Sequence, residues 1–240
     1  MEASSASLTP PPIHLHPAAP LAERVLLPGD PARALLLARS LLEKPLMFNH
    51  NRGLWGYTGQ APDGRPLTIQ STGMGGPSAA IVIAELANLG VRTLIRVGTC
   101  GALAAELALG DLVVVTEALS FDGTSGVLAR DARLLPDPGL CDLLAASALA
   151  RDHRGPVAST DLFYDGPPSE EERWREAGAL AVEMETATLF ALAGRRLLQA
   201  ASVLLVSDLL APSRARIDDE ALQEGERRLG QAAAEALSQI

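Results

Sequence analysis

A glycine and an arginine near residue 30 have the spacing expected of a small anion-binding site. The segment Pro28-Gly29-Asp30-Pro31-Ala32-Arg33 lies between an apolar run at 25–27 and a helical pattern that follows it. Glycine lets backbone N–H groups approach an anion closely. A helix N-terminus adds positive potential, and Arg33 supplies a forked guanidinium. The segment predicts an anion site, and a tight turn with a solvated arginine is the alternative.

A second arginine interrupts an apolar run. Arg96 stands among apolar neighbours at 94–97 and is followed by Gly98-Thr99-Cys100-Gly101. A buried arginine needs a partner, because desolvation without one is costly. Two interpretations stay open: a structural salt bridge, or a phosphate site that Arg96 shares with Thr99. Ligands collect at the carboxyl ends of strands in such sheets, which is where these residues are expected.

Three carboxylates stand near apolar segments toward the C-terminus. Glu183 and Glu185 are one residue apart at the predicted start of a helix over 184–193. On a helix they would face different sides, so no shared acid–base pair is expected. One is expected to cap or pair structurally, and the other to accept hydrogen bonds from sugar hydroxyls. Asp208 follows an apolar run at 200–206, which indicates a general acid or, alternatively, a helix N-cap.

The elements that must position these residues alternate between apolar strands and helices. Strands are predicted at 25–27, 53–59, 67–72, 93–97, 111–116, 157–159 and 200–206. Helices are predicted at 31–42, 79–89, 139–150, 170–176, 184–193 and 217–237. This alternation predicts an α/β fold, with one central, mixed and mostly parallel sheet flanked by helices on both faces. Residues 21–240 are expected to form a single domain, and the proline-rich residues 1–20 an extended arm.

Composition excludes several classes of protein. The 240 residues carry a net charge of −9, which argues against nucleic acid as a partner. No apolar run reaches membrane-spanning length, and the N-terminus lacks a signal-like pattern. The two cysteines are expected to be free thiols, and neither lies in a zinc motif. No dinucleotide or P-loop motif is present. A cytoplasmic protein without a metal or an organic cofactor is therefore predicted.

Taken together, the motifs resemble the nucleoside phosphorylase family. That family includes hexameric purine nucleoside phosphorylases, uridine phosphorylases and archaeal methylthioadenosine phosphorylases. The resemblance runs from about His14 to the C-terminus, and the order and spacing of its segments are specific. The matching segments are PGDPAR at 28–33, NRG at 51–53, GMGGPS at 73–78, RVGTCGAL at 96–103, STDLFY at 159–164, VEMETATLF at 182–190 and VSD at 206–208.

The resemblance implies a site with three parts. Phosphate, the co-substrate, would be held by Gly29, Arg33, Arg96 and Thr99, and by Arg52 of a neighbouring subunit. The ribose would be bordered by Met74, Glu183, Met184, Glu185 and a neighbour's His14, with Glu185 accepting from the 2′- and 3′-hydroxyls. The base would meet Cys100, Gly101, Phe163, Val182, Ser207 and Asp208, with Phe163 stacking on it and Asp208 acting on a purine N7. The resemblance also implies a homohexamer, built as a trimer of dimers.

Departures from the family pattern favour a purine substrate. Uridine phosphorylases typically carry a Gln-x-Arg element after the FY motif, and the segment 165–170 contains neither residue. They also tend to lack the aspartate that is present here as Asp208. We therefore predict the reversible phosphorolysis of purine (deoxy)ribonucleosides to free base and (deoxy)ribose 1-phosphate. Uridine phosphorylase and methylthioadenosine phosphorylase are the alternatives.

The same departures leave proton delivery open. Bacterial hexameric purine enzymes usually have a histidine after the aspartate and an arginine on the C-terminal helix that assists it. Leu209 stands in the first place, and the candidates for the second are Arg214, Arg216 and Arg227. A nucleosidase that uses water is disfavoured, because the arginines at 33, 52 and 96 would have no anion to bind. A non-catalytic nucleoside-binding protein is the remaining alternative.

Overall fold

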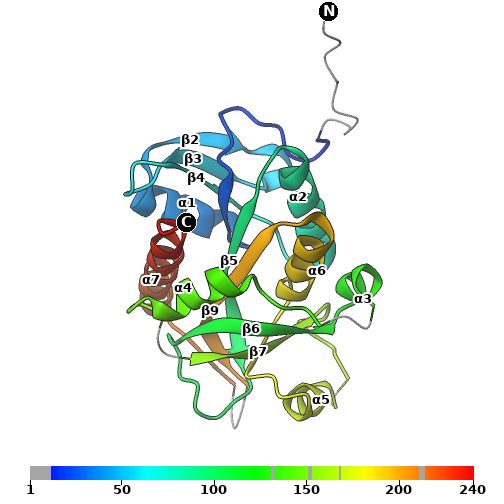
Figure 1. Ribbon diagram of the computed structural model, residues 1–240. Coiled ribbons are helices and arrows are strands. Elements are labelled where there is room, and N and C mark those ends of the chain that lie inside the picture. Colours follow the sequence, from blue (N-terminus) through cyan, green and yellow to red (C-terminus); the bar gives the residue numbers. More distant parts are fainter. Residues whose placement is uncertain (1–11, 131–132, 151–152, 168, 211–213) are drawn as a thin grey trace, which may run out of the picture.

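The computed structural model describes residues 12–130, 133–150, 153–167, 169–210 and 214–240, so most of the predicted arm lies outside the described residues (Figure 1). The strands are β1 Arg24–Leu27, β2 Glu43–Asn49, β3 Gly56–Gln60, β4 Pro66–Gln70, β5 Thr93–Ala102, β6 Leu112–Phe121, β7 His153–Thr160, β8 Ala181–Glu183, β9 Gln199–Leu209 and β10 Ala215–Arg216. The helices are α1 Pro31–Leu41, the 3-10 turn η1 Asn51–Gly53, α2 Gly76–Asn88, α3 Gly123–Leu128, α4 Pro138–Ala146, α5 Glu170–Glu176, α6 Thr186–Arg196 and α7 Asp219–Leu237.

The described strands form one mixed sheet that closes partly on itself. Their order is β10-β9-β6-β7-β8-β5-β1-β4-β3-β2, and β9 also pairs with β5. Strands β5, β9, β6, β7 and β8 therefore form a closed ring, from which β1, β4, β3 and β2 extend. The long pairings of β5 with β9 and of β6 with β7 are parallel, whereas β2, β3 and β4 pair antiparallel. The carboxyl ends of β1, β5 and β9 consequently lie at one edge.

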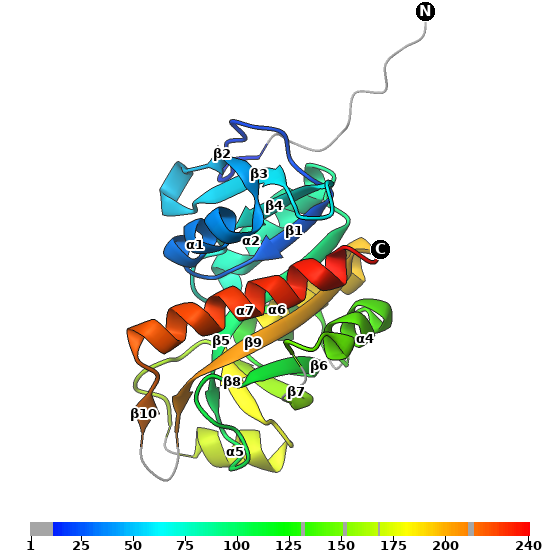
Figure 2. The same ribbon diagram turned by 90° about the vertical axis from the view of Figure 1, so that its left-hand side faces the viewer.

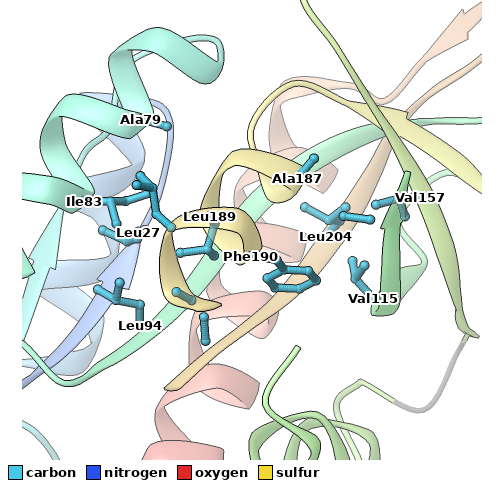
Figure 3. Packing of buried hydrophobic residues seen from close by; sticks show 14 of the residues in the cluster. Leu27, Ala79, Ile83, Leu94, Val115, Val157, Ala187, Leu189, Phe190 and Leu204 are labelled. Carbon is cyan, nitrogen blue, oxygen red and sulfur yellow. The ribbon is translucent and has the colours of Figure 1, made fainter. Parts of the chain in front are cut away.

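Helices cover both faces of this sheet, as predicted. On β1, Val25 and Leu27 pack into a core with α2 and α6, whereas Leu26 packs into a second core with α1, α4 and α7. Figure 3 shows α6 in the first core, with Leu189 beside Leu27 and Phe190 toward the strands of the ring. Successive side chains along the strands thus point into two different cores. The sheet is therefore buried on both faces, rather than buried on one and exposed to solvent on the other. Within the described residues, no helix is long and apolar enough to cross a membrane.

Several predicted boundaries are wrong, and each error has a local cause. The predicted strand at 93–97 continues to Ala102 as β5, because its glycines pair with β9 and β8 instead of turning. The strand predicted from residue 53 begins at Gly56, after the turn η1. The helix predicted from Met184 begins at Thr186. Strands β2 and β10 and helix α3 were not predicted from the sequence, since their short or mixed patterns lack a clear period.

Helix α7 lies diagonally across β9 and β5 in Figure 2, and two glycines allow its close approach. A Cβ atom added at Gly225 would lie 2.7 Å from Cδ1 of the buried Leu205 on β9. A Cβ atom at Gly230 would overlap the side chain of Leu37 on α1. These contacts fix the distance between α7 and its neighbours.

We expect Gly225→Ala to destabilise the protein although alanine is the better helix former. Overpacking against Leu205 costs about 1–3 kcal/mol, and the propensity gain returns about 1 kcal/mol. Gly194→Ala in α6 is the matched control, because nothing lies within 4 Å of its added Cβ atom. Urea denaturation should show a net loss for the first variant and a gain for the second. Equal gains in both would contradict close packing of α7.

Candidate active site

A cavity of about 810 Å³ opens where the carboxyl ends of β1, β5 and β9 meet. The side chains and backbone around it come from these strands, from the turn between β8 and α6, and from α5 and α7. Every site residue predicted from the sequence lines this cavity except His14. The predicted residues in its wall are Gly29, Arg33, Arg52, Met74, Arg96, Thr99, Cys100, Gly101, Phe163, Val182, Glu183, Met184, Glu185, Ser207 and Asp208.

At the end of the cavity next to α1, Arg33 is buried and held by protein groups. Its Nε lies 2.7 Å from Glu226 Oε1 of α7, and its Nη1 donates to the Val97 carbonyl oxygen at 3.2 Å. The alternative of a solvated arginine is therefore wrong. The N-terminal amides of α1 are also occupied, because Asp30 accepts from the backbone N–H groups of Ala32 and Arg33. Any anion here would meet the guanidinium rather than the helix end.

Arg96 forms the structural salt bridge that was one interpretation of the sequence, and its phosphate role stays a prediction. Its Nε lies 2.9 Å from Glu183 Oε2 and its Nη2 lies 2.6 Å from Glu185 Oε2. The guanidinium folds back over Gly98, where a Cβ atom would lie 2.6 Å from Nη2. Its Nη1 has no hydrogen-bond partner among the described residues. Burial alone would lower the pKa of Arg96, but the carboxylates of Glu185 and Glu183 outweigh it and raise that pKa.

Glu183 and Glu185 meet on one arginine, so the prediction that they face different sides is wrong. Neither lies inside a helix: Glu183 ends β8 and Glu185 is the N-cap residue of α6. The Glu183 carboxylate also accepts from Ser159 and from the backbone N–H groups of Glu185 and Thr186. Its oxygens are thus engaged within the protein. It anchors Arg96 and the start of α6.

Glu185 is the more exposed carboxylate of this pair, since its side chain is 8 % exposed and that of Glu183 is 0 % exposed. Its Oε1 accepts from the backbone N–H of Gly75, and its Oε2 faces Arg96. Burial raises the pKa of Glu185, and the nearby charge of Glu183 adds to the rise, while Arg96 opposes it. The Glu185 side chain thus lies in the cavity wall in direct contact with Arg96.

A β-bulge sets the direction of Asp208. Cys100 of β5 pairs with Val206 of β9, whereas the next residue, Gly101, pairs with Asp208, so Ser207 is the extra residue. Bulges re-aim side chains in this way. Ser207 Oγ donates to Asp208 Oδ2 at 2.7 Å. Burial, and then the charge of Glu183, raises the pKa of the Cys100 thiol, so this thiol stays protonated.

Aromatic and basic side chains surround the far end of the cavity. Phe163 is 56 % exposed and stands edge-on to Tyr164, with ring centroids 4.8 Å apart. The Arg214 guanidinium carbon lies 5.9 Å from the Phe163 ring centroid. Arg216 of β10 is the register partner of Asp208.

Of the three arginines considered as partners of Asp208, only two are placed to act on the cavity. Arg214 and Arg216 belong to the cavity wall. Arg227 is not part of that wall, and instead it pairs with Glu224 on α7 at 3.2 Å.

The two residues predicted to reach a neighbouring subunit behave differently in the single chain. His14 Nδ1 lies 2.8 Å from Glu85 Oε1 of α2, away from the cavity. Arg52 sits in η1 with a φ of 58°, and it lines the cavity of its own chain. Both placements in a neighbour's site stay predictions.

Several residues of the cavity wall were not found by reading the sequence. Glu226 is the clearest case, since it is buried and contacts Arg33 directly. The sequence does contain a signal for Glu226, because this residue lies on the apolar side of α7, four residues after Leu222 and three before Leu229. A carboxylate in an apolar stripe needs a partner. Trp174 of α5 also lines the wall, but no local motif marks it.

The fold and the site together describe an α/β protein with one cavity at the carboxyl ends of its central strands. The wall of this cavity combines the arginines of β5 and α1, the carboxylates of Glu183 and Glu185, and the Phe163 ring with Asp208. The sequence profile of the Phosphorylase superfamily matches residues 23–240. The chain belongs to this superfamily, which confirms the resemblance noted in its motifs.

Curated relatives and solved structures extend the comparison. A purine nucleoside phosphorylase DeoD-type of Jannaschia sp. is 40 % identical over 87 % of this chain and 88 % of its own. The protein of the same name in Geobacillus kaustophilus is 39 % identical over 78 % of this chain and 81 % of its own. A uridine phosphorylase from Vibrio fischeri, solved with 6-hydroxy-1-naphthoic acid, is 28 % identical with a TM-score of 0.83, covering 92 % of this chain and 93 % of that one.

Loss of the Glu183 carboxylate should destabilise the fold more than loss of the Glu185 carboxylate. Glu183→Ala removes a partner of Arg96 and two backbone caps, and breaking such a buried pair costs about 3–5 kcal/mol. Glu185→Ala leaves Arg96 paired with Glu183, so the loss should be smaller. The free energies of unfolding in urea at neutral pH measure the difference. Equal losses would show that Glu183 is not the anchor.

Proposed function

We propose that this protein catalyses the reversible phosphorolysis of purine ribonucleosides and deoxyribonucleosides. The observation that carries the proposal is one cavity whose wall combines Arg33, Arg52 and Arg96 with Phe163 and Asp208. The names of the curated relatives support the same activity. The reaction yields a free base and (deoxy)ribose 1-phosphate.

Phosphate binding relies on orientation. Phosphate attacks C1′ of the sugar and must be held without losing its nucleophilicity. Arg33 and Arg96 are each paired with carboxylates, so neither presents an uncompensated charge. The unpartnered Nη1 of Arg96, among the described residues, is a donor left over for the anion. Fixed donors of this kind lower the barrier by positioning and by charge stabilisation.

The sugar lies between the two ends. Glu185 is the residue suited to the 2′- and 3′-hydroxyls, because a carboxylate accepts from two hydroxyls at once. Its contact with Arg96 places the sugar next to the phosphate. The ribosyl group gains cationic character as the glycosidic bond breaks, and the carboxylate stabilises that charge.

The base leaves with developing negative charge, so a proton at N7 assists its departure. Asp208 is held beside Ser207 and opposite Arg216 at this end of the cavity. It is the proposed general acid. Arg216 is the better candidate for its assistant, since it pairs in register with Asp208, whereas Arg214 lies over Phe163.

Uridine phosphorolysis is the second candidate, favoured by the likeness to the Vibrio fischeri uridine phosphorylase. The segment 165–170 argues against uridine as the substrate, because it contains no glutamine or arginine side chain that could bind a uracil edge. Methylthioadenosine stays a third substrate to test.

Three further features belong to the proposal. The implied roles of His14 and Arg52 need a neighbouring subunit, and the family resemblance implies a homohexamer of three dimers. Inorganic phosphate is the co-substrate, and no metal or organic cofactor takes part. The free and buried cysteines Cys100 and Cys141 suit a reducing compartment, and the cytoplasm is the proposed location.

Incubation with inosine, guanosine, adenosine, methylthioadenosine and uridine, each with and without phosphate, tests the activity. We expect base release from the purine nucleosides that depends on phosphate, since the arginines serve that anion. Turnover without phosphate would identify a nucleosidase. Turnover of uridine alone would contradict the purine assignment, and an active monomer in sedimentation would contradict the shared site.

Asp208→Asn should lower kcat/KM for inosine by about 100-fold, because the amide cannot donate the proton. 7-Methylguanosine is the matched control substrate, since its N7 is already quaternary and needs no proton. The variant should cleave it within about threefold of the unsubstituted protein. Equal losses on both substrates would mean that Asp208 binds the base without protonating it.

A further inference from the structure

Glu226 places a carboxylate beside the proposed phosphate site, where its charge opposes the ligand. Its Oε1 lies 2.7 Å from Arg33 Nε, and the two side chains are only 8 % and 7 % exposed. Both residues line the cavity. A carboxylate that weakens an anion site by repulsion needs a compensating role.

Orientation of Arg33 is the role that the contacts support. An arginine side chain has many rotamers, and ordering it costs free energy each time a ligand binds. Here the guanidinium is held from two sides, by Glu226 at Nε and by the Val97 carbonyl oxygen at Nη1. The fork is therefore fixed before the anion arrives, which lowers the cost of binding.

The position of Glu226 is itself set by the packing of α7. The preceding residue, Gly225, brings the helix against Leu205 of β9, and Gly230 brings it against Leu37 of α1. Arg33 lies on α1, so the same packing that joins α7 to α1 sets the distance between the ion-pair partners. At the far end of α7, Arg24 donates to the Leu237 carbonyl oxygen at 2.8 Å.

We propose that Glu226 is a positioning residue for phosphate: it holds Arg33 in the geometry that the nucleophile needs. The inference rests on the proposed phosphorolysis and assigns a residue of the C-terminal helix to it. Glu226 acts through a hydrogen bond at a fixed distance. Its negative charge is secondary, because the charge itself disfavours the anion.

Two conservative variants distinguish the effect of the distance between Glu226 and Arg33 from the effect of the Glu226 charge. Glu226→Gln keeps the length and an acceptor oxygen but removes the charge, whereas Glu226→Asp keeps the charge but withdraws the carboxylate. We expect the Asp variant to raise the KM for phosphate about tenfold, with the KM for inosine within about twofold. The Gln variant should stay within about threefold of the unsubstituted KM for phosphate.

Glu224→Ala is the matched control on the same helix. Its carboxylate is 77 % exposed and pairs only with the surface residue Arg227 among the described contacts. Neither KM should change in this variant. Urea denaturation of all three variants shows whether each is folded.

Two outcomes would overturn the role of Glu226. A larger rise in the phosphate KM for Gln than for Asp would show that charge, and not position, matters. Equal changes in the KM for phosphate and inosine would show a general structural role. Failure of the unsubstituted protein to turn over any purine nucleoside with phosphate would instead overturn the proposed function, and that result is distinct from both.

Discussion

The buried ion cluster of Arg96, Glu183 and Glu185 is the interaction on which the rest of the site depends. A guanidinium inside a central strand would be prohibitively costly without partners. Glu183 ends β8 and Glu185 caps α6, so the junction of these two elements must lie against β5. The cluster thus joins the ring of strands to the helix that fills the first core. It also leaves one guanidinium nitrogen without a partner among the described residues.

The same principle applies to Arg33, a second buried arginine of the cavity wall. Arg33 is neutralised by Glu226 as Arg96 is by its two carboxylates, so positive charge at this end of the cavity is balanced locally. Such a site selects ligands by the directions of its N–H groups more than by net attraction. This suits a protein whose overall charge is −9, because long-range steering of anions toward it is weak.

Local features of the site could be predicted from the sequence, whereas its connections could not. Gly29, Arg96 and Asp208 were placed correctly because each directly adjoins or interrupts an apolar strand. The shared contact of Glu183 and Glu185 with Arg96 was missed, since the helix was assumed to begin two residues too early. The bulge at Ser207 and the contact of Arg33 with Glu226 join segments that no local pattern relates. Helices and central strands followed from their periods, but the ring of strands did not.

That ring has a consequence for how specificity can change over evolution. Strands β5, β9, β6, β7 and β8 have neighbours on both sides, so they cannot slide without breaking several ladders at once. The part of the cavity wall that includes Phe163 and the short β10 is carried by segments attached to this rigid frame. Substitutions in those segments can change the shape of this part of the cavity while the frame keeps Arg96 in place. Related enzymes with different bases can therefore share one architecture.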